Sequence, residues 1–187
     1  MPPDASATKR RILDAARTEF ARFGLAGARV DRIAETAEAN KRSIYVHFGP
    51  KEHLFDLVVI DALTVMAAEV PFDADDLPGY AGRLFDHLRD HPETLRLSLW
   101  ANLERPTATA VEEEAYRGKA EALRPAFGAS APDVLAFLLS VVTAGATASP
   151  ALLLTDGGDI WSEGRRALVI AAADGLIARL REGASAD

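Results

Sequence analysis

The chain has 187 residues, of which 49% are hydrophobic, and its net charge is −7. This length allows one sizeable core, or one core plus a small head, because a domain of about 150 residues buries about 70% of its unfolded surface. The sequence has no cysteine, which excludes a disulfide framework and a thiolate metal site and fits a reducing compartment, so we expect a cytoplasmic protein. Residues 1–7 lack the basic start and apolar core of a secretory signal, so we expect a disordered lead.

The charge is unevenly distributed along the chain. Residues 1–55 contain ten Lys or Arg against seven Asp or Glu, a net charge of +3, whereas residues 56–187 contain eleven against twenty-one, a net charge of −10. Phosphate groups repel an acidic body, so this distribution favours contact with nucleic acid through the N-terminal part. The alternative is that a helical protein simply scatters its charges in this way.

Two short helical patterns meet between residues 30 and 48, after a first predicted helix over residues 8–24 that ends at a glycine. The first short pattern has four apolar residues at positions i, i+3, i+4 and i+7, which line one face: Val30, Ile33, Ala34 and Ala37. Asn40 can accept a hydrogen bond from the free N–H groups of the next turn, so the second helix begins near Lys41. Its inward side carries Ile44 and Phe48.

The outward side of the second short helix has the chemistry of DNA recognition. Arg and Lys can fork onto O6 and N7 of guanine, as Lys41 and Arg42 would, while the hydroxyl groups of Ser43 and Tyr45 suit phosphates. This pattern predicts a helix-turn-helix whose second helix enters the major groove. The segment 49–52, Gly-Pro-Lys-Glu, then opens a long helix that we expect to continue to about residue 70.

The matching positions of a family pattern run through residues 8–58 without a gap: Arg11-Ile12-Leu13-Asp14-Ala15-Ala16, Phe20, Gly24, Val30, Ile33-Ala34, Ala37, Lys41, Ile44-Tyr45, His47-Phe48 and Lys51-Glu52-His53-Leu54. This segment resembles the N-terminal domain of TetR/AcrR-type transcriptional regulators. The resemblance implies an all-α homodimer that binds a palindromic operator, usually as a repressor, and releases it when a small ligand enters the C-terminal domain.

The chain departs from the family pattern at two places. Glu38 stands where a turn glycine is common, so it must either adopt a left-handed conformation or form another kind of turn. Ala28 and Arg29 stand where a Ser or Thr commonly caps the first short helix, and Arg29 is a candidate to contact phosphate instead. The predicted DNA-binding residues are Arg29, Asn40, Lys41, Arg42, Ser43, Tyr45, His47 and Lys51, of which Lys51 rests on the resemblance.

The rest of the chain is also predicted to be helical. A loop rich in Pro, Gly and Asp over residues 71–79 separates the long helix from helices near residues 80–90, 92–105 and 109–124. The run of Glu112, Glu113 and Glu114 is interpreted as a solvated helix face. No strand pattern of useful length and no repeat is present.

Two apolar helices in the last third of the chain indicate a dimer. Residues 134–148 are apolar nearly all round and residues 167–180 largely so, but about 20 residues are needed to span a membrane, so we expect no membrane contact. We expect a four-helix interface with two helices from each subunit. Its predicted residues are Leu138, Val142, Leu168, Ala172 and Leu176, and the alternative is a core within one chain.

Evidence for an enzyme is weak. His87 and His91 are four residues apart, but no third ligand is identifiable, so we predict no metal, and no nucleotide or nucleophile motif indicates a cofactor or catalysis. An effector pocket between bundle helices is expected to be apolar with a few polar groups. Its predicted lining is Met66, Phe85, His87, His91, Leu99, Trp100, Asn102, Tyr116, Phe137 and Val141, each of which could instead be ordinary core.

We therefore predict an all-α protein with a three-helix DNA-binding head over residues 8–50 and a helical effector-binding and dimerisation domain over residues 51–187. The predicted function is a DNA-binding transcriptional regulator, a ligand-responsive repressor that binds a palindromic operator as a homodimer and responds to a small apolar or aromatic effector. The alternative is a helical dimeric module that binds a ligand or partner without sequence-specific DNA binding.

Overall fold

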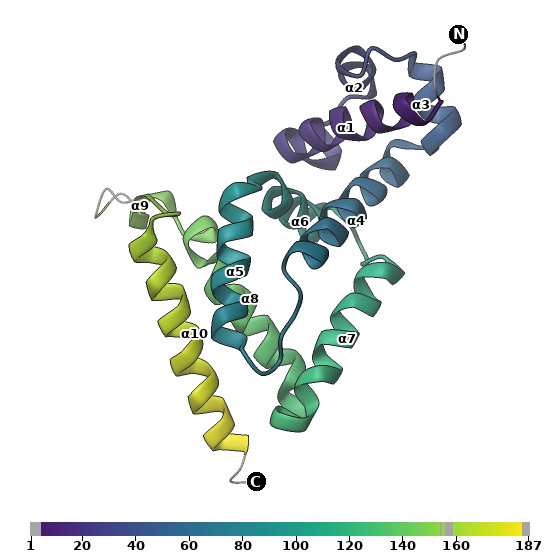
Figure 1. The fold of residues 1–187 in the computed structure, drawn as a ribbon. Helices are drawn as coiled ribbons and strands as arrows, with labels where there is room; N and C mark the ends of the chain where they lie inside the picture. The colour runs from purple at the N-terminus through teal and green to yellow at the C-terminus, as the bar shows by residue number, and fades with distance from the viewer. Residues whose placement is uncertain (1–4, 154, 156–158, 185–187) are drawn as a thin grey trace. The chain divides into compact units, whose positions relative to one another are not determined.

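The computed structural model describes residues 5–153, 155 and 159–184, and within these ranges the chain is helical without any strand (Figure 1). The all-α prediction is therefore confirmed. The helices are α1 (Ala5–Gly27), α2 (Val30–Thr36), α3 (Lys41–Phe48), α4 (Lys51–Glu69), α5 (Leu77–Asp90), α6 (Pro92–Glu104), α7 (Ala110–Phe127), the 3₁₀ turn η1 (Gly128–Ser130), α8 (Ala131–Thr147), α9 (Pro150–Leu153) and α10 (Glu163–Ala184).

The predicted helix starts at Lys41, Lys51 and Pro92 are confirmed. They could be predicted because a capping residue or a proline marks each start in the sequence. The main differences lie at α1 and α5. Residues 5–7 belong to α1 rather than to a disordered lead, and residues 1–4 lie outside the described ranges. α5 begins before the predicted residue 80, because the Asp76 carboxylate accepts a hydrogen bond from the Gly79 N–H at 2.9 Å and so satisfies a free donor of the first turn.

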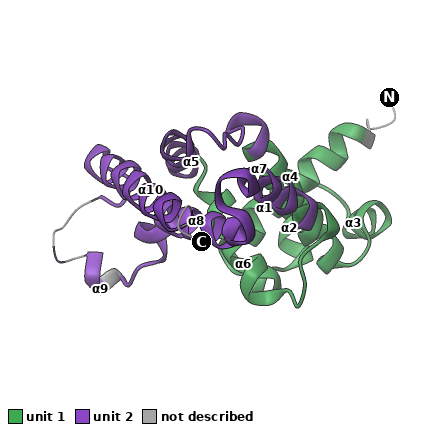
Figure 2. Ribbon diagram, turned by 90° about the horizontal axis from the view of Figure 1, so that it is seen from below, with its two compact units in different colours: residues 1–66, 91–112 green, residues 67–90, 113–187 purple. Residues whose placement is uncertain are grey.

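The chain forms two compact units, coloured green and purple in Figure 2. Unit 1 contains residues 1–66 and 91–112, and unit 2 contains residues 67–90 and 113–187. The predicted boundary at residue 50 assigned α6 and all of α4 to the second domain. In the structure α6 belongs with the head, because it packs along α1.

The core of unit 1 joins α1, α2 and α3 to α4 and α6. Phe20 of α1 and Phe55 of α4 meet edge to face, with ring centroids 5.1 Å apart. Both side chains are fully buried, so the start of α4 is part of the core of the head. The rest of this core includes Ile12, Ile33, Ile44, Leu54, Val59 and Leu97.

A buried ion-pair network in unit 1 joins α4, Arg105 and the start of α7. The Arg105 guanidinium lies 3.1 Å from Asp56 of α4 and 2.6 Å from Glu112 of α7. Glu112 also accepts hydrogen bonds from the N–H and hydroxyl of Thr109, which caps α7. The interpretation of Glu112 as a solvated residue is therefore wrong, since Glu112 is 8% exposed, whereas Glu113 and Glu114 are exposed.

Unit 2 is built on α5, which packs against α8 and α10. Arg166 of α10 binds Asp86 of α5 with N–O distances of 2.8 and 2.9 Å, and Gly82 lets Ile170 approach the α5 backbone closely. The largest fully buried side chains of this unit are Tyr80, Leu77, Leu123 and Leu138.

One helical stretch, Ala110–Thr147, is long and apolar enough to cross a membrane by length and composition alone. This stretch is interrupted at η1, where Gly128 has a φ of 54°, and α8 by itself has 17 residues. Core helices of soluble proteins pass the same test, and α8 buries Val134, Leu135 and Val142 within its own unit. The stretch is therefore weak evidence for a membrane protein.

Candidate functional site

The helix α3 is fixed at its start by a side-chain cap and along its length by an apolar stripe. The Asn40 side chain accepts a hydrogen bond from the Arg42 N–H at 2.8 Å, as the sequence predicts. Ile44 and Phe48 are 1% and 6% exposed and anchor the helix in the core of unit 1. The remaining side of α3 is therefore presented outward in a single orientation.

The turn between α2 and α3 uses a left-handed residue that is not glycine. Glu38 has a φ of 49°, so the first of the two predicted possibilities holds. Backbone hydrogen bonds from the Glu38 N–H to Glu35 (3.1 Å) and from the Ala39 N–H to Ala34 (2.9 Å) hold the turn. The strained conformation is thus compensated by the closed turn and by the packing of Ala37 beneath it.

The missing cap of α2 is replaced by an acid from α1. Arg29 makes no side-chain cap, but the Glu19 carboxylate accepts hydrogen bonds from the Arg29 N–H and the Arg32 Nε, both at 2.8 Å. Glu19 is buried, so it fixes the start of α2 against α1. Spacing along one helix could not reveal this contact, because the two residues belong to different helices.

The outward side of α3 gathers most of the predicted DNA-binding residues. Lys41, Arg42, Tyr45 and His47 are exposed and Ser43 is half-buried. Lys41 lies 2.7 Å from the Asp31 carboxylate, and this hydrogen bond raises the pKa of Lys41. In the described part of the chain, no ion pair or hydrogen bond engages the Arg42 guanidinium. Arg42 is therefore available to a ligand.

Two predicted residues flank this surface. Arg29 is exposed at the start of α2, and Lys51 at the start of α4 is half-buried with its Nζ donating to the Ala28 carbonyl oxygen at 3.2 Å. Both lie in unit 1 with α3. Sequence reasoning missed Val46, whose side chain is 71% exposed on α3. Val46 lies on the side of α3 opposite the buried Ile44 and Phe48.

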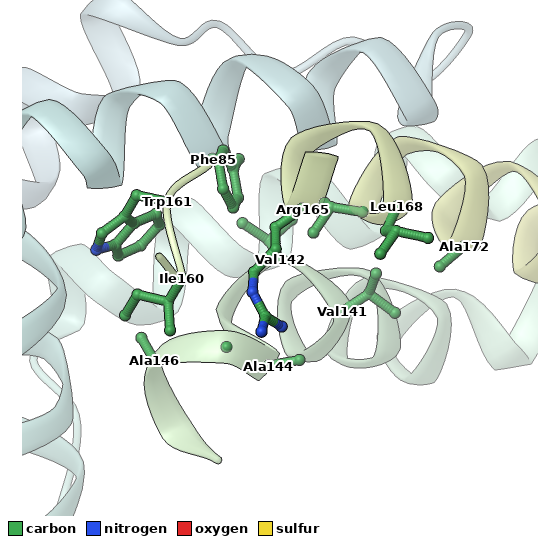
Figure 3. A pocket seen from close by; sticks show the side chains of 12 residues that line it. Phe85, Val141, Val142, Ala144, Ala146, Ile160, Trp161, Arg165, Leu168 and Ala172 are labelled. Carbon is green, nitrogen blue, oxygen red and sulfur yellow. The ribbon is translucent and has the colours of Figure 1, made fainter. Parts of the chain in front are cut away.

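A pocket of about 290 Å³ lies in unit 2, between α8, α10 and the residues that precede α10 (Figure 3). Phe85 and Trp161, which both line it, meet edge to face with ring centroids 5.0 Å apart. Arg165 contributes a guanidinium and extends between Ile160 and Val141 (Figure 3). The other lining residues are Val142, Ala144, Gly145, Ala146, Leu168, Val169 and Ala172. A largely apolar pocket with one guanidinium suits a small amphipathic molecule.

The predicted effector residues are not brought together. Only Phe85 and Val141 line this pocket. Trp100 instead packs on α1, where a Cβ at Gly24 would lie 2.8 Å from its ring. The remaining members lie in unit 1 (Met66, His91, Leu99 and Asn102) or elsewhere in unit 2 (His87, Tyr116 and Phe137). Tyr116 and Phe137 are exposed, whereas the buried His87 ring lies 3.1 Å from the Glu69 carboxylate.

The predicted dimer residues divide into two groups. Leu138 and Val142 are 0% and 2% exposed within one chain, so they are core residues and not interface residues. For these two positions the alternative prediction, a core within one chain, is the correct one. Leu168 and Ala172 are exposed and Leu176 is half-buried on α10. The two groups differ because α5 covers one side of α8.

Comparison with known proteins agrees with this geometry. The family model described as "Bacterial regulatory proteins, tetR family" matches residues 12–58, and the model described as "Tetracyclin repressor-like, C-terminal domain" matches residues 76–174. The HTH-type transcriptional repressor SCO4008 of Streptomyces coelicolor is 40% identical over an alignment of 189 positions, which covers 94% of this chain and 98% of that protein. The chain belongs to the TetR family.

Two further proteins are also similar to the chain. The HTH-type transcriptional regulator RutR of Escherichia coli is 35% identical over 98 residues, or 49% of this chain and 46% of its own. The crystal structure of the regulator SCO4942 of Streptomyces coelicolor superimposes with a TM-score of 0.79 at 36% identity and covers 90% of this chain and 97% of that one. This TetR-family chain is a DNA-binding transcriptional regulator. Its relatives have this non-enzymatic role, and they do not support the alternative of a module without DNA binding.

Proposed function

We propose that the chain is a cytoplasmic, ligand-responsive repressor that binds a palindromic operator as a homodimer. The observation that carries this proposal is the outward side of α3, where Arg42 stands unengaged on a capped and anchored helix. A short helix with an exposed Arg in its first turn has the geometry by which helix-turn-helix proteins contact base edges. Repression, in place of activation, follows the similarity to the SCO4008 repressor.

The residues of this surface would divide into two roles. Arg42 would fork onto a guanine, with Lys41 beside it held in place by Asp31. Phosphate contacts would come from Arg29, Ser43, Tyr45, His47 and Lys51, while Asn40 acts through its cap.

Selection of bound duplexes from random DNA tests the proposal, and an enriched palindrome is the expected result. Arg42→Ala should then weaken operator binding by about 1–3 kcal/mol and relax the preference at one base pair of each half-site. Arg117→Ala removes an exposed cation from unit 2 and should leave operator affinity unchanged. A chain that enriches no sequence would refute the proposal.

The dimer would form through the exposed side of α10 and the neighbouring side of α8. Leu168 is 66% exposed and Phe137 is 50% exposed, and nothing lies within 4 Å of a Cβ built at Gly175. Large exposed apolar residues next to a position that permits close helix approach suit a helix-helix contact. Leu168→Glu should yield monomers in sedimentation and weaken operator binding, since each half-site alone binds weakly.

The effector would be a small apolar or aromatic compound in the pocket of unit 2. A ligand releases DNA only if it binds the free state more tightly than the operator-bound state, and the coupling is reciprocal. Trp161 lines the pocket, and the chain has two tryptophans, so Trp100→Phe leaves Trp161 as the sole tryptophan reporter. A compound that changes Trp161 fluorescence and also releases the operator is expected from a library titration. A library without such a compound would leave a constitutive DNA-binding dimer.

A further inference from the structure

The outward side of α3 carries one aliphatic residue that is mostly exposed. Val46 is 71% exposed, whereas Ile44 and Phe48 on the same helix are buried. Successive residues of an α-helix are about 100° apart, so Val46 lies about 180° from the midpoint of the directions of Ile44 and Phe48. Val46 is therefore the outermost position of the helix that the proposed function places against DNA.

The fold itself gains little from valine at this position. A β-branched residue has a lower helix propensity than alanine, and an exposed side chain contributes no burial. Single exposed apolar residues are common on protein surfaces, so exposure alone carries no conclusion. What distinguishes Val46 is its place at the outermost position of α3, next to Arg42.

Arg42 stands beside it, one helical turn earlier. The two residues are separated by four positions, so they lie on neighbouring parts of the same side, about 6 Å apart along the helix axis. Base pairs follow one another at about 3.4 Å, so two side chains at this separation would reach bases one or two steps apart. The other cation of this turn, Lys41, is already engaged with Asp31.

The chemistry of the pair is complementary. A guanidinium forks onto guanine, whereas an apolar side chain in the major groove can contact only one apolar group, the 5-methyl group of thymine. We propose that Val46 contacts the 5-methyl group of a thymine one or two base steps from the guanine bound by Arg42. This inference rests on the proposed operator binding, and it assigns a specificity-determining role to a residue that has no polar atom in its side chain.

Replacement of thymine by deoxyuridine tests this contact, because it removes only the methyl group. Each thymine of the selected operator is replaced in turn, and the affinity of the full chain is measured by fluorescence anisotropy. We expect one position per half-site at which replacement weakens binding about fourfold, the value of one buried methyl group. Val46→Ala should weaken binding to the thymine operator by a similar factor and bind the thymine and deoxyuridine operators equally.

Two controls isolate the contact. Val111→Ala also removes part of an exposed valine, on α7, and should keep the full preference for thymine. Circular dichroism and thermal unfolding should show that Val46→Ala is as stable as the parent chain, since the residue is exposed. With that result, loss of folding would not account for a lost preference of Val46→Ala for thymine over deoxyuridine.

The outcomes separate this inference from the proposed function. An enriched operator that tolerates deoxyuridine at every position, or that has no thymine in its half-sites, overturns the assignment of Val46 and leaves operator binding intact. A Val46→Ala variant that still prefers thymine overturns it in the same way. Failure to enrich any sequence overturns both together.

Discussion

In unit 1 the proposed DNA-binding surface is positioned by polar side chains at helix ends, whereas in unit 2 the pocket is positioned by apolar packing between long helices. Asn40, Glu19 and Glu104 each satisfy free N–H groups at a break or start of a helix in the head. The pocket of unit 2 is instead bounded by residues such as Phe85 and Trp161, with Arg165 at its side. The comparison indicates that short helices need fixed ends, because they bury too little surface to fix their own orientation.

Replacement of Arg105 should have the largest effect among the tests of polar contacts in unit 1. Its side chain is 9% exposed and pairs with Asp56 and Glu112, so Arg105→Ala would leave two acids partly buried without their cation. We expect a loss of about 3–5 kcal/mol in the free energy of unfolding, measured with denaturant. The exposed pair of Arg117 and Glu114 provides the control, and Arg117→Ala should cost less than about 1 kcal/mol. Similar costs for both variants would contradict a structural role for the network.

The same network predicts a pH dependence. Burial by itself raises the pKa of Glu112, but the hydrogen bonds from Arg105 and Thr109 outweigh it and lower the pKa below its ordinary value of 4.5. A lowered folded-state pKa contributes stability that is full above the unfolded value and is lost as the pH falls through the folded one. Acid unfolding below pH 4.5 should therefore be less steep in Glu112→Gln than in the parent chain.

Leu138 and Leu168 separate the two roles of the apolar helices in unit 2. Leu138→Ala should destabilise the chain by about 2–5 kcal/mol, because the side chain is fully buried within one subunit. Leu168→Ala should change the free energy of unfolding of the monomer by less than about 0.5 kcal/mol, since the side chain is mostly exposed. Equal destabilisation of dilute monomer by both variants would show that α10 packs differently.

Gly24 tests the join between α1 and α6. Its φ is 67°, and an added Cβ would lie 2.8 Å from the Trp100 ring and from Glu104, so Gly24→Ala should cost about 1–3 kcal/mol. The control is Gly118→Ala in α7, where nothing lies within 4 Å of a Cβ, and a helical alanine should stabilise by about 0.5–1 kcal/mol. Thermal unfolding measures both changes, and opposite signs are expected.

Replacement of Glu38, in the turn between α2 and α3, should have the smallest effect on stability. Glu38→Gly should remove left-handed strain and stabilise the turn by about 1 kcal/mol, whereas Glu35→Gly, within α2, should destabilise by a similar amount. Hydrogen exchange of the α2 and α3 amides reports the change locally. Equal signs for both variants would show that the Glu38 conformation carries no strain.

Local chemistry allowed much of the head to be predicted. The cap at Asn40, the stripe of Ile44 and Phe48 and the start of α4 at Lys51 depend on neighbours in sequence, and the structure confirms them. The positive φ of Glu38 was one of the two conformations that the sequence allowed, because the turn also depends on neighbours in sequence. Interactions within one or two helical turns are encoded by spacing, so a single sequence is sufficient to predict them.

Contacts between distant segments were decided only by the tertiary structure. The carboxylate of Glu19 caps α2, Glu112 is buried by Arg105 in place of facing water, and Trp100 packs on Gly24 in place of a pocket. The sequence by itself determined most of the helices and the cap of α3, because these depend on local spacing, and it determined the family through its match to a known pattern. It did not determine which apolar side of α8 faces its own core, or which charges are paired, because both depend on which helices pack together.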